Sequence, residues 1–318
     1  MMNRYLSITR RHLLGVLAAM MPATHAIPQR RLLRETPKGN VMGNIPAHKP
    51  IAVKTEDRLS IAAQDWGNPN GREILFIHGL GQSHLSWIRQ LRSSLLTEHR
   101  VVTYDLRGHG NSEKPPDEAY YAEGGRWGDE LAAVIAATGL QRATLVGWSL
   151  GGVVITNYLA RHGGDKIAAI NFVDAGTKLD DAVFGDANAR IGPTLVDPDL
   201  AVRIQGIRTF LRACFALQAD PDTFELMLAY NAMPPIEVHR AMSKITIDGA
   251  DAALRALRVP VLVTHGEQDQ LFRIAVSQYT ASAVPNAQLS VYANAGHSPF
   301  FEDSARFNRE LTALVRRS

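Results

Sequence analysis

Short apolar runs alternate with helical patterns along most of the chain. The runs cover residues 73–77, 101–104, 143–146, 168–174, 259–264 and 288–292. Continuous apolar runs of this length are typical of parallel strands that helices cover on both faces. Residues 127–138 and 307–315 carry apolar side chains at helical spacing. The alternation therefore predicts an α/β fold with a doubly wound, mostly parallel sheet.

Two departures from this alternation predict further features. Residues 51–54 and 59–64 flank a Thr-Glu-Asp turn and predict an opening hairpin. After residue 174 no strand pattern returns until residue 259, and an interval this long is not a loop in a compact domain. We expect residues 177–250 to form a helical cap over the active site, inserted after the sixth strand. The candidates to line an acyl pocket there are Phe184, Phe210, Phe215, Phe224, Met227 and Met233.

The cap divides the α/β core into residues 51–176 and 251–318, and the N-terminal segment is separate from both. Residues 1–11 are basic, residues 12–21 are apolar but too short to span a bilayer, and residues 23–26 (Ala-Thr-His-Ala) offer small residues for cleavage. This order predicts a signal peptide over residues 1–26, followed by a linker over 27–50. Arg10 and Arg11 resemble a twin-arginine export signal. We expect a periplasmic protein without stable membrane insertion after signal removal; the alternative is a cytoplasmic protein with a misassigned start.

Composition removes several classes of partner and cofactor. The chain has 318 residues, and its formal net charge of +3 falls to 0 when the three arginines of the signal are removed. No nucleic-acid partner is therefore expected. Cys214 is the single cysteine, which excludes an intramolecular disulfide and a cysteine-based metal cluster. The chain shows no metal-ligand spacing and no dinucleotide fingerprint after its first core strand, so we expect neither a metal nor a cofactor. The oligomeric state stays open.

Ser149 is the strongest candidate for chemistry. It is the centre of Gly147-Trp148-Ser149-Leu150-Gly151, between a predicted strand and a helical pattern. Glycines permit a turn this sharp, and the turn holds the hydroxyl clear of the sheet where a base can reach it. The context predicts a nucleophile elbow.

A serine nucleophile needs a base, and the base needs an orienting acid. Asp269 follows the predicted strand 259–264, and His297 follows the strand 288–292. In sheets of this kind, active sites form at the carboxyl ends of strands. We therefore predict Ser149, His297 and Asp269 as the catalytic residues. Asp174 closes the strand before the cap and is the alternative acid.

Four sequence blocks carry a family resemblance: FIHGLGQS at 76–83, YDLRGHGNS at 104–112, LVGWSLGG at 145–152, and the HGEQD and NAGHSPF segments. From about residue 51 onward the chain resembles α/β-hydrolase fold proteins, especially esterases and non-haem haloperoxidase-type perhydrolases. The order Ser…Asp…His is that of the superfamily. The resemblance implies an oxyanion hole made by the backbone N–H groups of Leu80 and Leu150.

These observations favour a serine hydrolase that cleaves small-molecule carboxylic esters or related acyl substrates through an acyl-enzyme. Perhydrolysis is an alternative, although haloperoxidase-type members typically place a tryptophan where Leu80 stands. Lactone opening and carbon–carbon bond hydrolysis use the same residues. A non-catalytic ligand sensor is the alternative from another class, because a fold alone does not fix a function.

Overall fold

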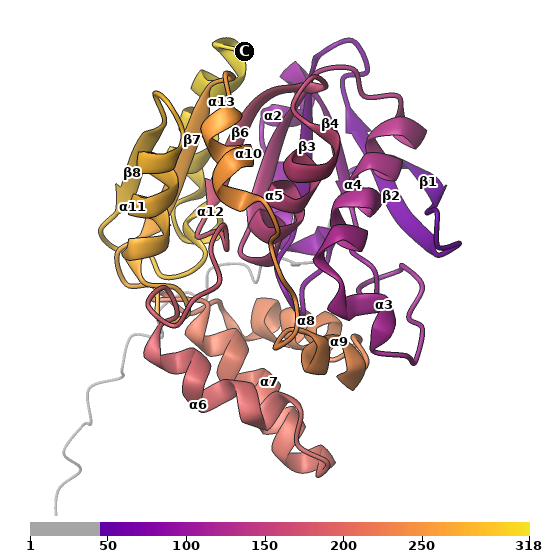
Figure 1. Ribbon diagram of the computed structural model, residues 1–318, viewed down its shortest axis with the longest axis vertical. Coiled ribbons are helices and arrows are strands. Elements are labelled where there is room, and N and C mark those ends of the chain that lie inside the picture. The colour runs from indigo at the N-terminus through magenta and orange to yellow at the C-terminus, as the bar shows by residue number, and fades with distance from the viewer. Residues whose placement is uncertain (1–44) are drawn as a thin grey trace, which may run out of the picture. The chain divides into compact units, whose positions relative to one another are not determined.

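An eight-stranded sheet organises residues 45–318, the part of the chain that the computed structural model describes (Figure 1). The strand order is β1-β2-β4-β3-β5-β6-β7-β8. β2 pairs antiparallel with β1 and β4, and all other neighbours are parallel. The strands are β1 (His48–Lys54), β2 (Ser60–Gly67), β3 (Arg72–Ile77), β4 (His99–Tyr104), β5 (Ala143–Trp148), β6 (Ile167–Val173), β7 (Val261–Gly266) and β8 (Gln288–Tyr292). The predicted opening hairpin and mostly parallel sheet are confirmed.

Helices cover the sheet on both faces. The helices of residues 45–318, including those of the cap described below, are α1 (Ile88–Leu91), α2 (Leu95–Glu98), α3 (Ala119–Ala122), α4 (Gly124–Thr138), α5 (Leu150–His162), α6 (Asp186–Leu195), α7 (Leu200–Ala213), α8 (Pro221–Asn231), α9 (Ile236–Ala241), α10 (Ala250–Ala256), α11 (Ile274–Ala283), α12 (Pro299–Glu302) and α13 (Ser304–Arg316). A 3₁₀ turn precedes α1 at His84–Trp87.

The side chains of β3 show how the two apolar cores divide. Leu75 and Ile77 pack in the cluster that contains α4 and α5, whereas Ile74 and Phe76 pack in the cluster that contains α12 and α13. Successive strand residues point to opposite faces, so one apolar run serves both cores. All side chains of β5 and β6 are buried for the same reason. This double coverage explains why the strands read as continuous apolar runs.

The predicted helical cap after the sixth strand is confirmed. Between β6 and β7, helices α6 to α9 gather at one end of the sheet, and α10 packs against α5 (Figure 1). Polar residues start the longer cap helices: Asp199 accepts hydrogen bonds from the first-turn amides of α7, and Asp220 does so for α8, which opens with Pro221. Such N-cap side chains satisfy the first backbone amides of a helix, which have no partner within the helix.

The predicted signal peptide and most of the linker lie outside the described residues. Among residues 45–318, no helix combines the length and apolar character needed to cross a membrane. Cys214 is buried, in the cap.

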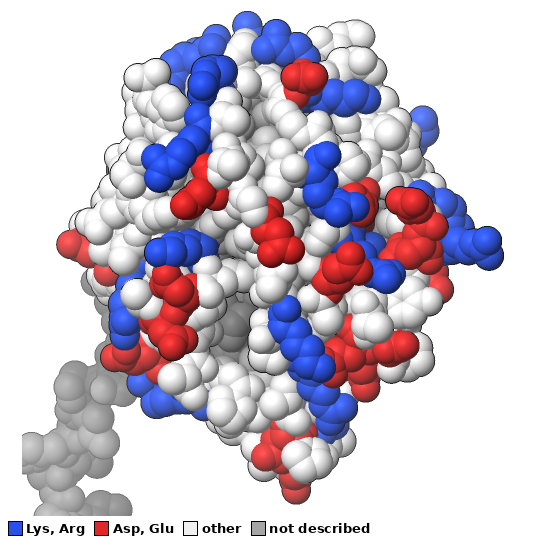
Figure 2. All heavy atoms as spheres, viewed as in Figure 1, with Lys and Arg blue, Asp and Glu red and all other residues white. Residues whose placement is uncertain are grey.

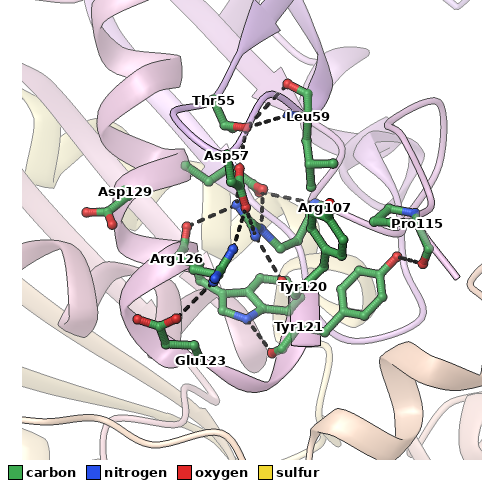
Figure 3. A network of polar contacts seen from close by, with 12 residues as sticks. Thr55, Asp57, Leu59, Arg107, Pro115, Tyr120, Tyr121, Glu123, Arg126 and Asp129 are labelled. Atoms are coloured by element: carbon green, nitrogen blue, oxygen red, sulfur yellow. Dashed lines mark hydrogen bonds and ion pairs between the residues drawn. The ribbon is translucent and has the colours of Figure 1, made fainter. Parts of the chain in front are cut away.

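A buried ion-pair network connects the hairpin turn, the loop after β4 and helix α4 (Figure 3). The Arg107 side chain is only 1% exposed; its Nε donates to Glu130 at 2.8 Å, and its Nη1 donates to Asp57 at 2.9 Å. The carbonyls of Tyr120 and Arg126 accept from the remaining guanidinium N–H groups. Burial raises the pKa of Glu130 to about 7, against the opposing effect of Arg107. Arg107 therefore holds three segments together.

Arg107→Leu is expected to lower the free energy of unfolding by about 3–5 kcal/mol, because it removes the cationic partner of the buried Glu130 carboxyl and leaves it only the backbone N–H of residue 107. Denaturant unfolding measures the loss. Arg126→Leu is the matched control, since Arg126 contacts the same Asp57 but is 36% exposed, and its removal should cost less than about 1 kcal/mol. Equal losses in the two variants would contradict the assignment of the network's strength to Arg107.

His239 in α9 gives the fold a measurable pH dependence. Both ring nitrogens are buried and have no partner among residues 45–318, and burial lowers the pKa of His239 to about 4. Below about pH 6.5 His239 binds a proton in the unfolded chain but stays neutral in the folded chain. His239 therefore reduces the free energy of unfolding as pH falls toward 4. His239→Leu should therefore gain stability over the wild type by about 1 kcal/mol per pH unit across that interval. A difference that stays constant between these pH values would contradict this.

Candidate active site

Ser149 occupies a strained turn between β5 and α5. Its φ is 54° and its ψ is −113°, a backbone conformation that residues other than glycine rarely adopt and that costs about 1–3 kcal/mol. The backbone fixes the turn: Ser149 N donates to Val173 O at 3.0 Å, and Ser149 O accepts from Gly152 N at 2.9 Å. A Cβ at Gly147 would lie 2.7 Å from the backbone oxygen of Gly151, so only glycine fits there. The strain indicates a functional turn, and the side chain stays partly exposed.

His297 and Asp269 form a buried pair. His297 Nδ1 lies 2.7 Å from Asp269 Oδ2, and both side chains are 1% exposed. Asp269 Oδ1 accepts from the amides of Leu271 and Phe272 at 2.7 and 3.1 Å. Burial works to raise the pKa of Asp269, but the charge and hydrogen bond of His297 outweigh it and the pKa lies below its usual value. Asp269 is therefore a fixed carboxylate acceptor for one imidazole nitrogen.

Two aromatic side chains hold His297 in place. Trp148 Nε1 donates to the backbone oxygen of His297 at 2.6 Å, and the Phe272 ring stacks on the imidazole with 5.7 Å between ring centroids. His297 Nε2 is buried and has no partner among residues 45–318. The arrangement leaves a single ring nitrogen free to accept a proton.

The structure joins two of the three predicted catalytic side chains directly. Asp269 and His297 are hydrogen-bonded, whereas no hydrogen bond connects Ser149 and His297 within residues 45–318. Two contacts connect Ser149 with this pair: its chain neighbour Trp148 donates to the backbone of His297, and Ser149 lines the same cavity as Phe272. In unliganded sites the serine–histidine bond is often long and tightens with substrate.

The loop after β3 lies against Ser149. A Cβ at Gly79 would be 3.1 Å from the Ser149 Cβ, so the glycine allows the close approach. Neither Leu80 N nor Leu150 N donates a hydrogen bond within residues 45–318. Leu150 is the first residue of α5, where the helix dipole favours negative charge. Both amides are free to bind an anionic oxygen.

Two buried histidines brace this loop. His78 Nε2 accepts from Leu106 N at 3.0 Å, and His109 Nε2 accepts from Gly81 N at 3.1 Å. An accepting nitrogen must be unprotonated, so both rings are neutral. Burial lowers the pKa of His78 to about 4 and that of His109 well below its usual value. These contacts give both histidines a structural role in holding the loop.

An apolar cavity of about 140 Å³ opens beside Ser149. Of the predicted pocket residues, Phe184 and Phe210 line it. The other four candidates do not: Phe215, Phe224, Met227 and Met233 lie elsewhere in the cap. The sequence did not predict the rest of the wall as a pocket lining; it consists of Leu80, Leu150, Val153, Leu179, Asn188, Met242, Ile245, Leu271 and Phe272. Among residues 45–318, Asn188 is the only polar side chain in the wall besides Ser149.

The competing acid, Asp174, is close by. It is fully buried after β6, and its ligand atoms lie within 4.8 Å of those of Asp269 and His297. The imidazole nitrogen nevertheless bonds Asp269. Among residues 45–318, Asp174, Asp269 and His297 are the acidic and histidine side chains placed closely enough to bind a cation together. Two of these three possible metal ligands, Asp269 and His297, are already hydrogen-bonded to each other.

Comparison with known proteins agrees with this geometry. Residues 73–304 match the family model of the alpha/beta hydrolase fold. The chain is 40% identical to a proposed aryl esterase of known structure from Burkholderia cenocepacia, with 84% of this chain and 98% of that chain covered and a TM-score of 0.81.

Two further relatives carry esterase or haloperoxidase names. A bifunctional esterase/perhydrolase of Acinetobacter calcoaceticus is 29% identical over 83% of this chain and 99% of its own. A non-heme haloperoxidase of Rhodococcus erythropolis is 27% identical over 83% of this chain and 98% of its own. With the fold, the strained serine turn and these matches in agreement, the chain belongs to the α/β-hydrolase family and is an enzyme of its esterase and haloperoxidase-like branch.

Proposed function

We propose that the protein is a serine hydrolase that cleaves carboxylic esters with Ser149, His297 and Asp269. The observation that carries the proposal is the buried Asp269–His297 pair, which leaves Nε2 unpartnered beside a strained serine turn. A serine is a weak nucleophile until an oriented base takes its proton.

Each group has one role in the proposed reaction. His297 Nε2 removes the Ser149 proton as the hydroxyl attacks the ester carbonyl, and then returns it to the leaving alcohol. Asp269 holds the imidazole and stabilises its charged form. The amides of Leu80 and Leu150 bind the oxyanion. Water, activated by the same histidine, then hydrolyses the acyl-enzyme.

The cavity limits the group that binds beside Ser149. An enclosed apolar volume of 150 Å³ holds benzene in another protein, so about 140 Å³ admits one group of roughly that size. No charged side chain of residues 45–318 lines the cavity, and burying an unpaired charge there is costly. We therefore expect uncharged esters that place a short aliphatic chain or a single ring in this space.

A fluorophosphonate probe tests the proposal directly, because it labels an activated serine. We expect stoichiometric labelling of Ser149, and hydrolysis rates that fall for charged or long acyl groups in an ester panel. A chain that binds esters without labelling or turnover would instead support a ligand sensor on the same fold. Adding hydrogen peroxide to the ester assay separates hydrolysis from perhydrolysis.

We also propose that the protein is exported through a twin-arginine route. The basis is the order of basic, apolar and small residues over 1–26. Replacing Arg10 and Arg11 with lysine should retain an active enzyme in the cytoplasm, as measured by cell fractionation and N-terminal sequencing. Wild-type protein found uncleaved in the cytoplasm would overturn the export proposal and leave the hydrolase proposal intact.

A further inference from the structure

Asp174 is a buried carboxyl group that the proposed reaction does not use. It follows β6 in a left-handed conformation, with φ of 41°, and its exposure is 0%. One oxygen, Oδ1, accepts from Gly266 N at 2.9 Å. The other, Oδ2, is buried without a hydrogen-bond partner among residues 45–318. A buried polar atom without a hydrogen-bond partner lowers the stability of the fold, so we expect a specific role for Asp174 Oδ2.

The neighbouring Asp269 has room for one more donor. An ionised carboxylate offers about four acceptor positions on its two oxygens. Asp269 Oδ1 receives two backbone amides, and Oδ2 receives His297 Nδ1. One position on Oδ2 is therefore open, and a carboxylate oxygen of Asp174 lies within 4.8 Å of one of Asp269. Two ionised carboxylates in contact would each present acceptors and leave both positions unsatisfied.

We propose that Asp174 is a positioning residue: as a neutral carboxylic acid it donates a hydrogen bond to Asp269 and holds that carboxylate toward His297. One proton on Asp174 Oδ2 satisfies both open positions. The proposal rests on the proposed function for the role of Asp269, but the protonation of Asp174 can be measured without any turnover.

The surroundings of Asp174 favour the neutral form. Burial, followed by the negative charge of Asp269, holds the pKa of Asp174 well above its usual range. His265 Nδ1 lies 3.2 Å from Asp174 Oδ1 and 2.9 Å from Ser277 Oγ, and burial lowers the pKa of His265 to about 4, so it supplies no positive charge near neutrality.

The remaining titratable groups around Asp174 do not neutralise a second carboxylate either. They are His297, which Asp269 already pairs, and Glu302 and Cys214, which add only negative charge if ionised. No arginine or lysine contacts Asp174 in residues 45–318. Close carboxyl groups in such a setting share a single proton.

Infrared difference spectra test the protonation state. The spectrum of wild type minus Asp174→Asn, taken where ordinary aspartates are ionised, should contain the carbonyl band of a carboxylic acid, and deuterium oxide should shift it. Asp105→Asn is the control. Asp105 is equally buried, and burial works to raise its pKa, but the hydrogen bond from His84 outweighs this effect and lowers the pKa. Its difference spectrum should therefore show a carboxylate. A carboxylate band for Asp174 would overturn the proposal.

Kinetics test the positioning role. Asp174→Asn replaces the carboxylic acid with an amide of similar shape that also has an N–H donor. Its kcat/KM should therefore stay within about threefold of the wild-type value, a smaller change than the loss of one hydrogen bond would cause. Asp174→Leu removes the donor and should lower kcat/KM by about 10- to 100-fold. A folded Asp174→Leu variant with wild-type activity would overturn the role. An Asp174→Asn variant as impaired as Asp269→Asn would make Asp174 itself the triad acid. If the leucine variant does not fold, the asparagine variant and the infrared band decide the question.

Failure of this inference differs from failure of the proposed function. Wild-type protein that does not label with a fluorophosphonate would contradict the serine mechanism, whatever the infrared spectra show. Labelled, active protein with an ionised Asp174 would contradict only the positioning role.

Discussion

Ser149→Ala is expected to lower kcat/KM by about 10⁴-fold or more while leaving the fold intact. The expected loss is large because the hydroxyl is the only atom that forms the covalent bond, and neither His297 nor the two amides can replace it. The alanine side chain also fits the strained turn, since the backbone hydrogen bonds to Val173 and Gly152 do not involve the hydroxyl. Steady-state ester hydrolysis and thermal unfolding measure the two parts of the expectation.

Ser298→Ala is the matched control for this experiment. Ser298 is a second serine near the site: it is buried, lies next to His297 in the chain, and its hydroxyl has no hydrogen-bond partner among residues 45–318. Its removal should leave turnover near the wild-type value. Substantial esterase activity in purified Ser149→Ala, with no contaminating enzyme, would contradict the assignment of the nucleophile.

Asp269→Asn is expected to lower kcat by about 10³- to 10⁴-fold, as in other triads whose acid is replaced by its amide. The amide can donate to His297 Nδ1, which favours the wrong tautomer and leaves Nε2 protonated. The variant also removes the negative charge that stabilises the imidazolium in the transition state. Fluorophosphonate labelling should slow in proportion, because attack by the serine requires the same base.

The contrast between the two acids makes this prediction specific. The contacts of His297 favour Asp269 as its orienting acid, so Asp174→Asn should be far less damaging than Asp269→Asn. The opposite order would show that the acid after β6 serves the histidine and that the hydrogen bond to Asp269 is not the functional one.

The serine turn could be predicted from sequence because several independent constraints meet there. A buried strand must end, glycines must flank the turn and a helix must begin at Leu150, and each requirement leaves its own trace in the sequence. The observed φ of Ser149 and the crowding around Gly147 are the physical reasons for those traces.

The choice of acid could not be settled in the same way. β6 and β7 are neighbours in the sheet, so the residues that follow them, Asp174 and Asp269, arrive close together. Spacing along the chain locates both at the correct edge but says nothing about which carboxylate meets the imidazole. The proposed hydrogen bond between them leaves no signal in the sequence, and neither does the hydrogen bond from Trp148 to the backbone of His297.

The cap shows the limit of periodicity most clearly. Apolar spacing identifies the buried face of a cap helix but not its partner, and cap helices also pack on one another and on the core. Phe210 reaches the cavity, whereas Phe215 packs against Phe301 and Met233 is 44% exposed. The aromatic wall beside His297 comes from Phe272, in the loop after β7, where no periodic pattern points to a pocket.

Trapping the acyl-enzyme shows whether Ser149 carries the acyl group during turnover. Wild-type protein is mixed with an activated ester of a small uncharged acid, quenched in acid within one turnover, digested and analysed by mass spectrometry. We expect the mass of one acyl group on the peptide that carries Ser149, absent from Ser149→Ala and present in Ser298→Ala. Rapid ester hydrolysis with no acyl group on Ser149 at any time point would contradict this expectation.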